Sequence, residues 1–259
     1  MQAEMTVVSQ KEVAPLHYKM VLSHPEIAKT AKPGQFVHIR CGRQFSPLLR
    51  RPISIHDINA AEGQITILYR VVGEGTKILS QTAPGQVLDV LGPLGHGFTW
   101  SAEAQHLVFI GGGIGAAPLY AAAKAAVEEG KQVTFLLGAA KKEQLLCCAE
   151  LEKLGVKLHI CTDDGSVGFH GNTAQLLAEV MQQETPDYIG ACGPMPMLKA
   201  VAAKAGDIEC QVSLEEKMAC GIGACLGCVC KTEHNGQELF AKVCSAGPVF
   251  AAKKVKWNG

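Results

Sequence analysis

From residue 106 to residue 206 the sequence alternates between short apolar runs and longer amphipathic ones, and this alternation limits the folds open to the chain. The apolar runs are HLVFI (106–110), QVTFLLG (132–138), VKLHICT (156–162) and DYIGACG (187–193). Helical patterns follow them at 116–130, 142–155, 172–184 and 194–206. Strands that alternate with helices form a parallel sheet with helices on both faces. We therefore expect an α/β domain here, and the alternation stops near Ile208.

The first hundred residues have a different pattern. Short apolar or alternating runs occur at FVHIR (36–40), QITILYR (64–70) and QVLDVLG (86–92), and the turn sequences KPGQ, AEGQ and APGQ separate them. Several short strands at this spacing are typical of an antiparallel barrel or sandwich. The chain is thus expected to be multidomain, with a β-barrel before the α/β domain.

Composition excludes several classes of function. The 259 residues contain 24 Lys+Arg and 24 Asp+Glu, whereas nucleic acid and acidic membranes usually select a basic excess. The N-terminus lacks the pattern of a signal peptide, and glycines and a lysine interrupt the most apolar stretch, so no membrane span is expected. We expect a cytoplasmic protein with reduced thiols. Eleven cysteines is a high count for such a chain.

Four of these cysteines have a diagnostic spacing, Cys220-x4-Cys225-x2-Cys228-x15-Cys244. It matches the C-x4-C-x2-C…C pattern of plant-type [2Fe–2S] ligands, in which three thiolates share a tight loop and a distant fourth completes the set. The alternatives are a zinc site, which usually has two short C-x2-C pairs, and plain buried thiols. We interpret Cys230 as a neighbouring buried thiol because it is too close to Cys228 to replace a ligand easily.

Two stretches of the N-terminal region could bind a phosphorylated cofactor. RPISIHD (51–57) places an arginine and a serine three residues apart on a predicted strand, and an arginine can form paired hydrogen bonds with a phosphate. In LYRVVGEGT (68–76), two glycines allow close approach of the backbone, with a threonine hydroxyl beside them. The alternative interpretations are a buried strand with a surface arginine and a simple hairpin turn.

Two further turns follow strands of the expected sheet. GGGIGAAP (111–118) follows a strand, opens a helix and matches G-x-G-x-x-A, so a pyrophosphate could bind at the helix N-terminus. CGPMPML (192–198) and CTDDGSVGFHG (161–171) lie at the same edge of the sheet. However, the second strand ends in FLLGAAKK and lacks the usual acidic residue. A tight strand-to-helix turn that binds no ligand therefore remains an alternative interpretation.

These signals occur in one order that resembles the ferredoxin–NADP reductase superfamily: RPIS, LYRVVGEGT, LGPLGHGF, GGGIGAAPL, TDDGS and CGPMPM. With the C-terminal cysteines, nearly the whole chain resembles the electron-transfer subunits of NAD-dependent (class 1B) dihydroorotate dehydrogenases. The resemblance implies three regions, a β-barrel FAD domain at 1–101, a Rossmann-like NAD domain at 102–208 and a small [2Fe–2S] segment at 209–259.

Residue by residue, the resemblance implies three binding sites. The FAD site would be formed by Arg51, Pro52, Ile53, Ser54, Leu68, Tyr69, Arg70, Gly75 and Thr76. The NAD site would be formed by Gly111, Gly112, Gly113, Ile114, Gly115, Cys192, Gly193 and Pro194. The [2Fe–2S] cluster would be bound by Cys220, Cys225, Cys228 and Cys244. No catalytic side chain is expected, since the cofactors carry the chemistry.

The same resemblance implies an oxidoreductase subunit of de novo pyrimidine (UMP) biosynthesis. Electrons would pass from an FMN-containing catalytic partner through the cluster and FAD to NAD⁺, in a heterotetramer of two copies of each chain. The alternatives are a subunit of a ferredoxin- or sulfide-linked NADP oxidoreductase or of a cytosolic hydrogenase, a stand-alone oxygenase reductase, and a zinc-stabilised binding module. Lys141 and Lys142 could bind a 2′-phosphate, so the preference for NAD over NADP rests on the resemblance alone.

Overall fold

The computed structural model describes residues 1–42 and 46–257, and the chain divides into two compact units. One unit comprises Met1–Gly97, Glu215–Cys230 and Phe240–Pro248; the other comprises Phe98–Leu214, Lys231–Leu239 and Val249–Gly259. None of the helices in the described ranges is both long enough and apolar enough to span a bilayer. The expected region boundaries, after residues 101 and 208, stay predictions.

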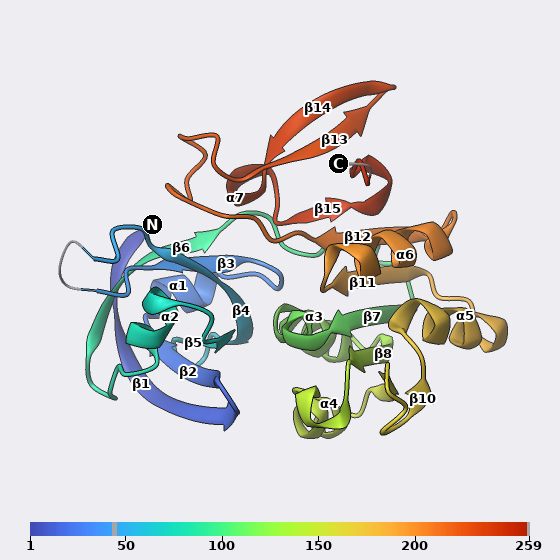
Figure 1. Ribbon diagram of the computed structural model, residues 1–259, viewed down its shortest axis with the longest axis horizontal. Helices are drawn as coiled ribbons and strands as arrows, with labels where there is room; N and C mark the ends of the chain where they lie inside the picture. The colour runs from blue at the N-terminus through green and yellow to red at the C-terminus, as the bar shows by residue number, and fades with distance from the viewer. Residues whose placement is uncertain (43–45, 258–259) are drawn as a thin grey trace. The chain divides into compact units, whose positions relative to one another are not determined.

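The first unit contains a closed six-stranded antiparallel barrel with strand order β1-β2-β5-β4-β3-β6 (Figure 1). Alternating residues of its strands point inward and form an apolar core that includes Met5, Met20, Ile55 and Ile67. Two short helices complete the barrel region. The elements are β1 (Gln2–Ala14), β2 (His17–Ser23), α1 (Pro25–Thr30), β3 (Phe36–Ile39), β4 (Arg51–Asn59), β5 (Gln64–Arg70), α2 (Glu74–Leu79) and β6 (Val87–Leu94).

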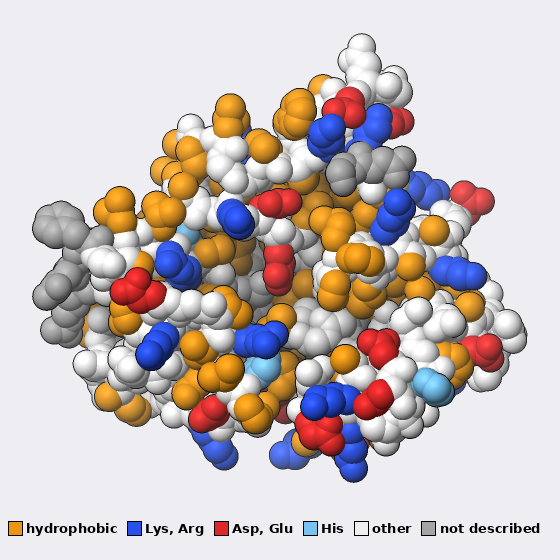
Figure 2. All heavy atoms as spheres, viewed as in Figure 1, with side chains coloured by type: hydrophobic (Ala, Val, Ile, Leu, Met, Phe, Trp, Pro, Cys, Tyr) orange, Lys and Arg blue, Asp and Glu red, His pale blue; other side chains and the backbone are white. Residues whose placement is uncertain are grey.

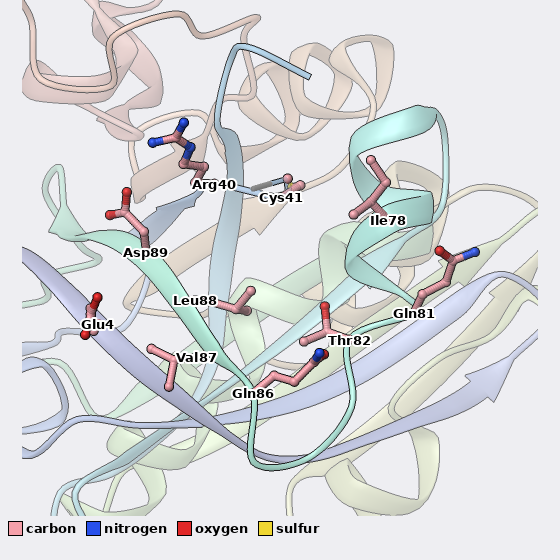
Figure 3. A pocket seen from close by; sticks show the side chains of 11 residues that line it. Glu4, Arg40, Cys41, Ile78, Gln81, Thr82, Gln86, Val87, Leu88 and Asp89 are labelled. Carbon is pink, nitrogen blue, oxygen red and sulfur yellow. The ribbon is translucent and has the colours of Figure 1, made fainter. Parts of the chain in front are cut away.

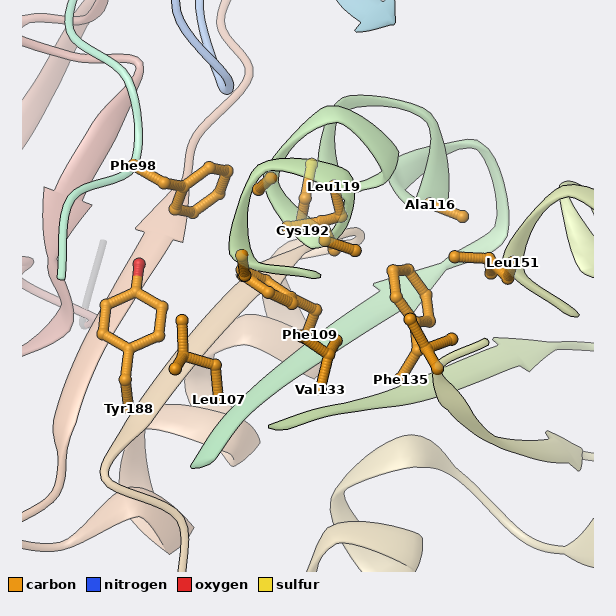
Figure 4. Close-up of a cluster of buried hydrophobic side chains, with 14 of the residues drawn as sticks. Phe98, Leu107, Phe109, Ala116, Leu119, Val133, Phe135, Leu151, Tyr188 and Cys192 are labelled. Carbon is orange, nitrogen blue, oxygen red and sulfur yellow. The ribbon is translucent and has the colours of Figure 1, made fainter. Parts of the chain in front are cut away.

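The second unit is built on a seven-stranded sheet with order β10-β9-β8-β7-β11-β12-β15, parallel except for β15. Helices cover both of its faces, as predicted (Figure 1). Aromatic residues fill one face of the sheet, where Phe109 packs edge-to-face on Tyr188 with ring centroids 6.1 Å apart (Figure 4). The main elements are β7 (His106–Gly112), α3 (Ala116–Glu128), β8 (Gln132–Ala139), α4 (Cys148–Leu154), β9 (Lys157–Thr162), β10 (Phe169–His170), α5 (Thr173–Gln183), β11 (Tyr188–Cys192), α6 (Met195–Ala205), β12 (Glu209–Ser213) and β15 (Val249–Ala251).

Two details of the predicted alternation were wrong. The helix expected over 142–155 is shorter, because a 3₁₀ turn ends at Gln144 and Cys147 takes a left-handed φ of 65° before α4 begins. The alternation also continues past Ile208, since β12 pairs in parallel with β11. Its sequence ECQVS is short and mixed in polarity, so the run gives a weak strand signal.

The C-terminal region contains a hairpin and a one-turn helix. β13 (Val229–His234) pairs with β14 (Gln237–Lys242), and α7 (Val243–Ala246) follows directly. Asn235 and Gly236 form the two-residue turn with φ values of 51° and 78°. Asn-Gly with positive φ at both positions is the preferred turn of a tight hairpin.

Candidate functional site

The four predicted cluster ligands lie in the same compact unit as the barrel. Cys220 and Cys225 belong to the loop before β13, Cys228 immediately precedes that strand, and Cys244 lies in α7. The Val243 N–H donates to the Cys228 carbonyl at 2.8 Å, which fixes the helix to the loop. Folding thus brings the distant fourth cysteine to the other three.

Backbone N–H groups of the loop point at these thiols. The Cys225 N–H donates to Sγ of Cys220 at 3.3 Å, and the Gly223 N–H donates to Sγ of Cys244 at 3.1 Å. Donors from Cys225 and Ile222 lower the pKa of Cys220 to about 6, whereas burial raises the pKa of Cys244 to about 11. Such donors also stabilise a cluster that carries negative charge on its sulfurs.

Thiol–thiol interactions join Cys220 with Cys225 and Cys228 with Cys244, and Cys220 also lies near enough to Cys244 to raise the pKa of Cys244. Within the part of the chain that the structure describes, no three of their Sγ atoms lie within 4.8 Å of one another. Four thiolates on one zinc ion, with Zn–S of about 2.3 Å, would all lie about 3.8 Å apart. Two neighbouring pairs, spaced more widely than four ligands of one ion, instead fit two metal atoms, so this donor set fits a [2Fe–2S] cluster better than zinc. The assignment of the ligands stays a prediction.

The barrel wall is open between the two segments predicted to contact the flavin ring. β4 and β5 pair from Ile55–Ile67 to Asn59–Gln64. Beyond that ladder, residues 51–54 pair with β3 and residues 68–70 pair with β2. In the described range 46–257, the facing backbone edges of residues 51–54 and 68–70 therefore do not pair with each other. Unpaired backbone groups of this kind can bind the rim of a planar ring that carries donors and acceptors.

Beside this opening, Arg51 lies against the start of α2. A Cβ at Gly75 would stand 2.6 Å from Nε of Arg51, so glycine lets the guanidinium side chain lie directly against this turn. Thr76 Oγ1 accepts hydrogen bonds from the N–H groups of Val72 and Gly73 at 3.0 and 3.3 Å. A guanidinium beside a glycine turn is suited to a phosphate. Since the Thr76 hydroxyl also donates to the Gly73 carbonyl, it closes the turn rather than standing free as a donor.

The other residues predicted to bind the flavin differ in their solvent exposure. Tyr69 is buried in the barrel core, and its hydroxyl donates to Oε1 of Gln10 at 2.9 Å, so only its backbone faces the opening. Arg70 is exposed, whereas Leu68 is buried. Pro52, Ile53 and Ser54 are all half-buried on β4.

A pocket of about 590 Å³ lies in the same unit, between α2 and the ends of β3 and β6 (Figure 3). Its walls include Arg40, Cys41, Ile78 and Thr82. Burial raises the pKa of Cys41 to about 11, against the opposing effect of the nearby Arg51 charge. Arg51 pairs with Ile39, two residues before Cys41, so the pocket lies near the arginine. Sequence reasoning missed the pocket because its lining residues carry no motif.

The two predicted nucleotide-binding turns meet at the carboxyl ends of neighbouring strands. β8 and β9 lie on one side of β7, and β11 and β12 lie on the other, so the chain order reverses between β7 and β11. Ligands of open α/β sheets bind at such a switch point. A Cβ at Gly115 would overlap the Cys192 carbonyl, and one at Gly112 would stand 3.1 Å from Pro194. The glycines thus let the two turns touch.

Two acidic residues follow the next strand, β9, and lie beside the end of β8. The N–H groups of Asp163 and Asp164, at the end of β9, donate to the carbonyls of Ala139 and Ala140 at 3.1 and 3.2 Å. The Lys142 N–H donates to Oγ of Ser166 at 2.9 Å. Both aspartates and lysines therefore stand at this edge of the sheet. The sequence predicted that CTDDGSVGFHG lies at this edge, but it did not predict the contacts with Ala139 and Ala140.

Gly115→Ala should raise the KM for NADH at least tenfold, because the new Cβ meets a backbone carbonyl that cannot move aside. Gly112→Ala is the matched comparison, since its Cβ would meet the Met197 sulfur at 2.5 Å, the end of a flexible side chain. Steady-state oxidation of NADH by ferricyanide measures both. Equal KM values in the two variants would contradict this account of the turn.

Sequence reasoning also missed the residues that pack around the cluster loop. Lys242 Nζ donates to the Gly223 carbonyl at 2.7 Å, and Oγ of Ser245 would stand 3.0 Å from a Cβ on that glycine. The ring of His38 lies against Gly221 in the same manner. Gly221 and Gly223 have left-handed φ values of 71° and 80°, which favour glycine. The two glycines were visible in the sequence, but their packing partners were not.

The barrel, the nucleotide-binding sheet and the paired cysteines together define a flavin- and iron–sulfur-dependent oxidoreductase that uses a pyridine nucleotide. Comparison with known families agrees with this class. Residues 215–256 match the iron–sulfur cluster binding domain of dihydroorotate dehydrogenase B, and residues 109–203 match the oxidoreductase NAD-binding domain.

Similar proteins define the family more closely. The chain is 43% identical over 248 residues to the dihydroorotate dehydrogenase B (NAD(+)) electron transfer subunit of Desulforamulus reducens, covering 95% of each chain. It is 44% identical to the protein of that name from Geobacillus thermodenitrificans, covering 97% of each. A chain in the structure of NADH-dependent reduced ferredoxin–NADP oxidoreductase superposes with a TM-score of 0.87 at 31% identity, covering 99% of this chain and 91% of that one. The chain belongs to the family of dihydroorotate dehydrogenase B (NAD⁺) electron transfer subunits.

Family membership confirms the resemblance drawn from the sequence, the barrel-plus-sheet fold and the set of FAD, iron–sulfur cluster and NAD. It also favours an iron–sulfur cluster over the zinc-stabilised alternative. The individual FAD, NAD and cluster residues stay predictions.

Proposed function

We propose that the chain is the electron-transfer subunit of a dihydroorotate dehydrogenase in de novo pyrimidine biosynthesis. Its partner would be an FMN-containing catalytic subunit, in a heterotetramer of two copies of each chain. The observation that carries the proposal is the paired-cysteine loop, which lies in the same compact unit as the flavin-binding barrel. When bound, the flavin exchanges hydride with a pyridine nucleotide and single electrons with an iron–sulfur cluster. The chain provides both sites within one unit.

The protein's own residues fix the position of the flavin. The unpaired edges of 51–54 and 68–70 bind the rim of the ring, and Arg51 with the turn at Gly75 binds the pyrophosphate. The pocket beside α2 would receive the adenosine end, since it lies near Arg51 and has the volume for a nucleoside.

The partner is expected to cover exposed apolar side chains beside the cluster ligands. Ile222 and Leu226 lie between the cysteines of the loop and are 60% and 72% exposed, and Phe240 on β14 is 67% exposed. Figure 2 shows apolar side chains gathered over this part of the molecule. Contiguous exposed apolar residues mark interaction surfaces. Docking here would exclude water from the cluster and bring it close to a cofactor of the partner.

Leu226→Asp should weaken the complex with the catalytic subunit at least tenfold, because it places a charge in the apolar contact. Iron and flavin contents should not change, since the side chain is 72% exposed. Val13→Asp is the control, at a 45% exposed position of β1. The dissociation constant of each variant complex is measured by titration with the purified partner. Equal affinities for both variants would place the partner elsewhere.

The function itself is tested by adding dihydroorotate and NAD⁺ to the two subunits, separately and together. NADH should form only when both subunits are present.

A second candidate, a subunit of a ferredoxin-linked NADP oxidoreductase, is favoured by the 31% identical structure and by Lys141 and Lys142. Preference for NADPH, with no turnover of dihydroorotate by any FMN-containing partner, would support that candidate. The eleven free cysteines suit a reducing compartment, so we place the protein in the cytoplasm.

A further inference from the structure

We propose that His38 is a positioning residue that holds the first cluster-ligand turn, Cys220–Gly221, against the flavin-binding strand β4. The inference rests on the cofactor set of the proposed function and concerns how this chain couples the two sites. His38 lies in β3, where it pairs with Pro52 on β4 and with Leu91 on β6. It therefore belongs to the strand next to the one expected to bind the flavin.

The imidazole of His38 is fully buried, and neither of its nitrogens has a hydrogen-bond partner of normal geometry among the described residues. Buried polar atoms without partners cost free energy and call for a physical explanation. The groups around the ring are the backbones of Arg50 and Cys220 and the charges of Arg50 and Arg51. A neutral imidazole carries one N–H, which can lie on either ring nitrogen.

The nitrogen nearest the cluster loop is Nδ1. A Cβ on Gly221 would overlap Nδ1 and would stand 3.0 and 3.1 Å from Cε1 and Cγ of His38, so the ring lies directly against this glycine. Two backbone carbonyls lie in reach of the ring, those of Arg50 and Cys220, and the Cys220 carbonyl belongs to the peptide group that Cys220 shares with Gly221. An N–H on Nδ1 therefore donates to the Cys220 carbonyl after a small adjustment of the turn.

Fixing this turn also fixes the donors that follow it. The N–H groups of Cys225 and Ile222 point at Sγ of Cys220, and their positions depend on the path of the chain after Gly221. Hydrogen bonds to the sulfurs raise the reduction potential of an iron–sulfur cluster. Loss of the His38 contact should loosen these donors and lower the potential of the cluster.

The test compares three substitutions in the full chain, with flavin and iron contents measured for each. His38→Leu keeps the bulk and removes both nitrogens, whereas His38→Asn places an amide near the position of Nδ1 and His38→Gln places one near Nε2. We expect His38→Leu to shift the one-electron equilibrium tenfold toward the oxidised cluster, which is about 59 mV in an EPR-monitored titration. His38→Asn should restore the wild-type potential, and His38→Gln should not.

His24→Asn is the control, since this barrel histidine caps α1 through the Ile27 N–H at 3.4 Å, and asparagine is also a good cap. It should leave the potential unchanged. An unchanged potential in His38→Leu would overturn the proposal. If that variant fails to bind iron or to fold, the other two decide: equal behaviour of the Asn and Gln variants would overturn the proposal, and a wild-type potential in the Asn variant alone would support it. A wild-type chain without iron would instead reject the proposed function.

Discussion

Cys228→Ser should remove the iron–sulfur cluster and leave the flavin bound. The Cys228 side chain is 1% exposed and pairs with Cys244, so its loss leaves one half of the metal site with a single thiol. The residues expected to bind FAD lie on β4, β5 and α2 and are not changed. Iron and sulfide should fall from about two per chain to near zero. NADH oxidation by ferricyanide should persist, while dihydroorotate-dependent formation of NADH should fall at least a hundredfold.

Cys230→Ser is the matched control for this substitution. Cys230 lies two residues from Cys228 and falls outside the C-x4-C-x2-C…C spacing that the other four cysteines share. Its variant should therefore keep the cluster. Loss of iron from Cys230→Ser and retention by Cys228→Ser would show that the loop binds its metal through a different set of cysteines.

Arg51→Gln should weaken FAD binding without affecting the cluster. A hydrogen bond to a charged group contributes about 1.5–3 kcal/mol, which corresponds to roughly a 10- to 150-fold rise in the dissociation constant. The measurement is fluorescence titration of the flavin-free protein with FAD. Lys77→Gln removes an exposed positive charge from the last turn of α2 and should change the affinity less than twofold. Equal losses in both variants would mean that the effect comes from net charge rather than from a contact at Gly75.

The sequence predicted those parts of the fold in which the signal is local. β7, β8, β9 and β11 are mainly apolar runs with helical spacing further along the chain, and the sequence predicted all four, whereas the two-residue β10 was not predicted. α4 was overestimated because the amphipathic pattern continues through Cys147, although the backbone there turns left-handed. β12 was missed because a five-residue strand of mixed polarity has no clear period. The Asn235-Gly236 hairpin was missed although it carries a strong turn signal.

The candidate site was predictable where one short segment supplies several ligands. Three of the cluster cysteines and the GGGIG turn have such spacing. Features made by distant segments were not predictable. They are the packing of His38 on Gly221, the lining of the pocket beside Ile78, and the backbone hydrogen bond from Asp163 to Ala139. Each joins residues more than twenty positions apart, so no local pattern records it.

The most direct test of electron transfer between NADH, flavin and cluster is an anaerobic titration of the purified chain with NADH, followed by absorbance and EPR. Flavin, iron, sulfide and zinc are assayed on the same sample. The account predicts one flavin, two irons and two sulfides per chain, bleaching of the flavin band, and an EPR signal from the reduced cluster. A colourless protein that contains zinc and does not oxidise NADH would contradict it.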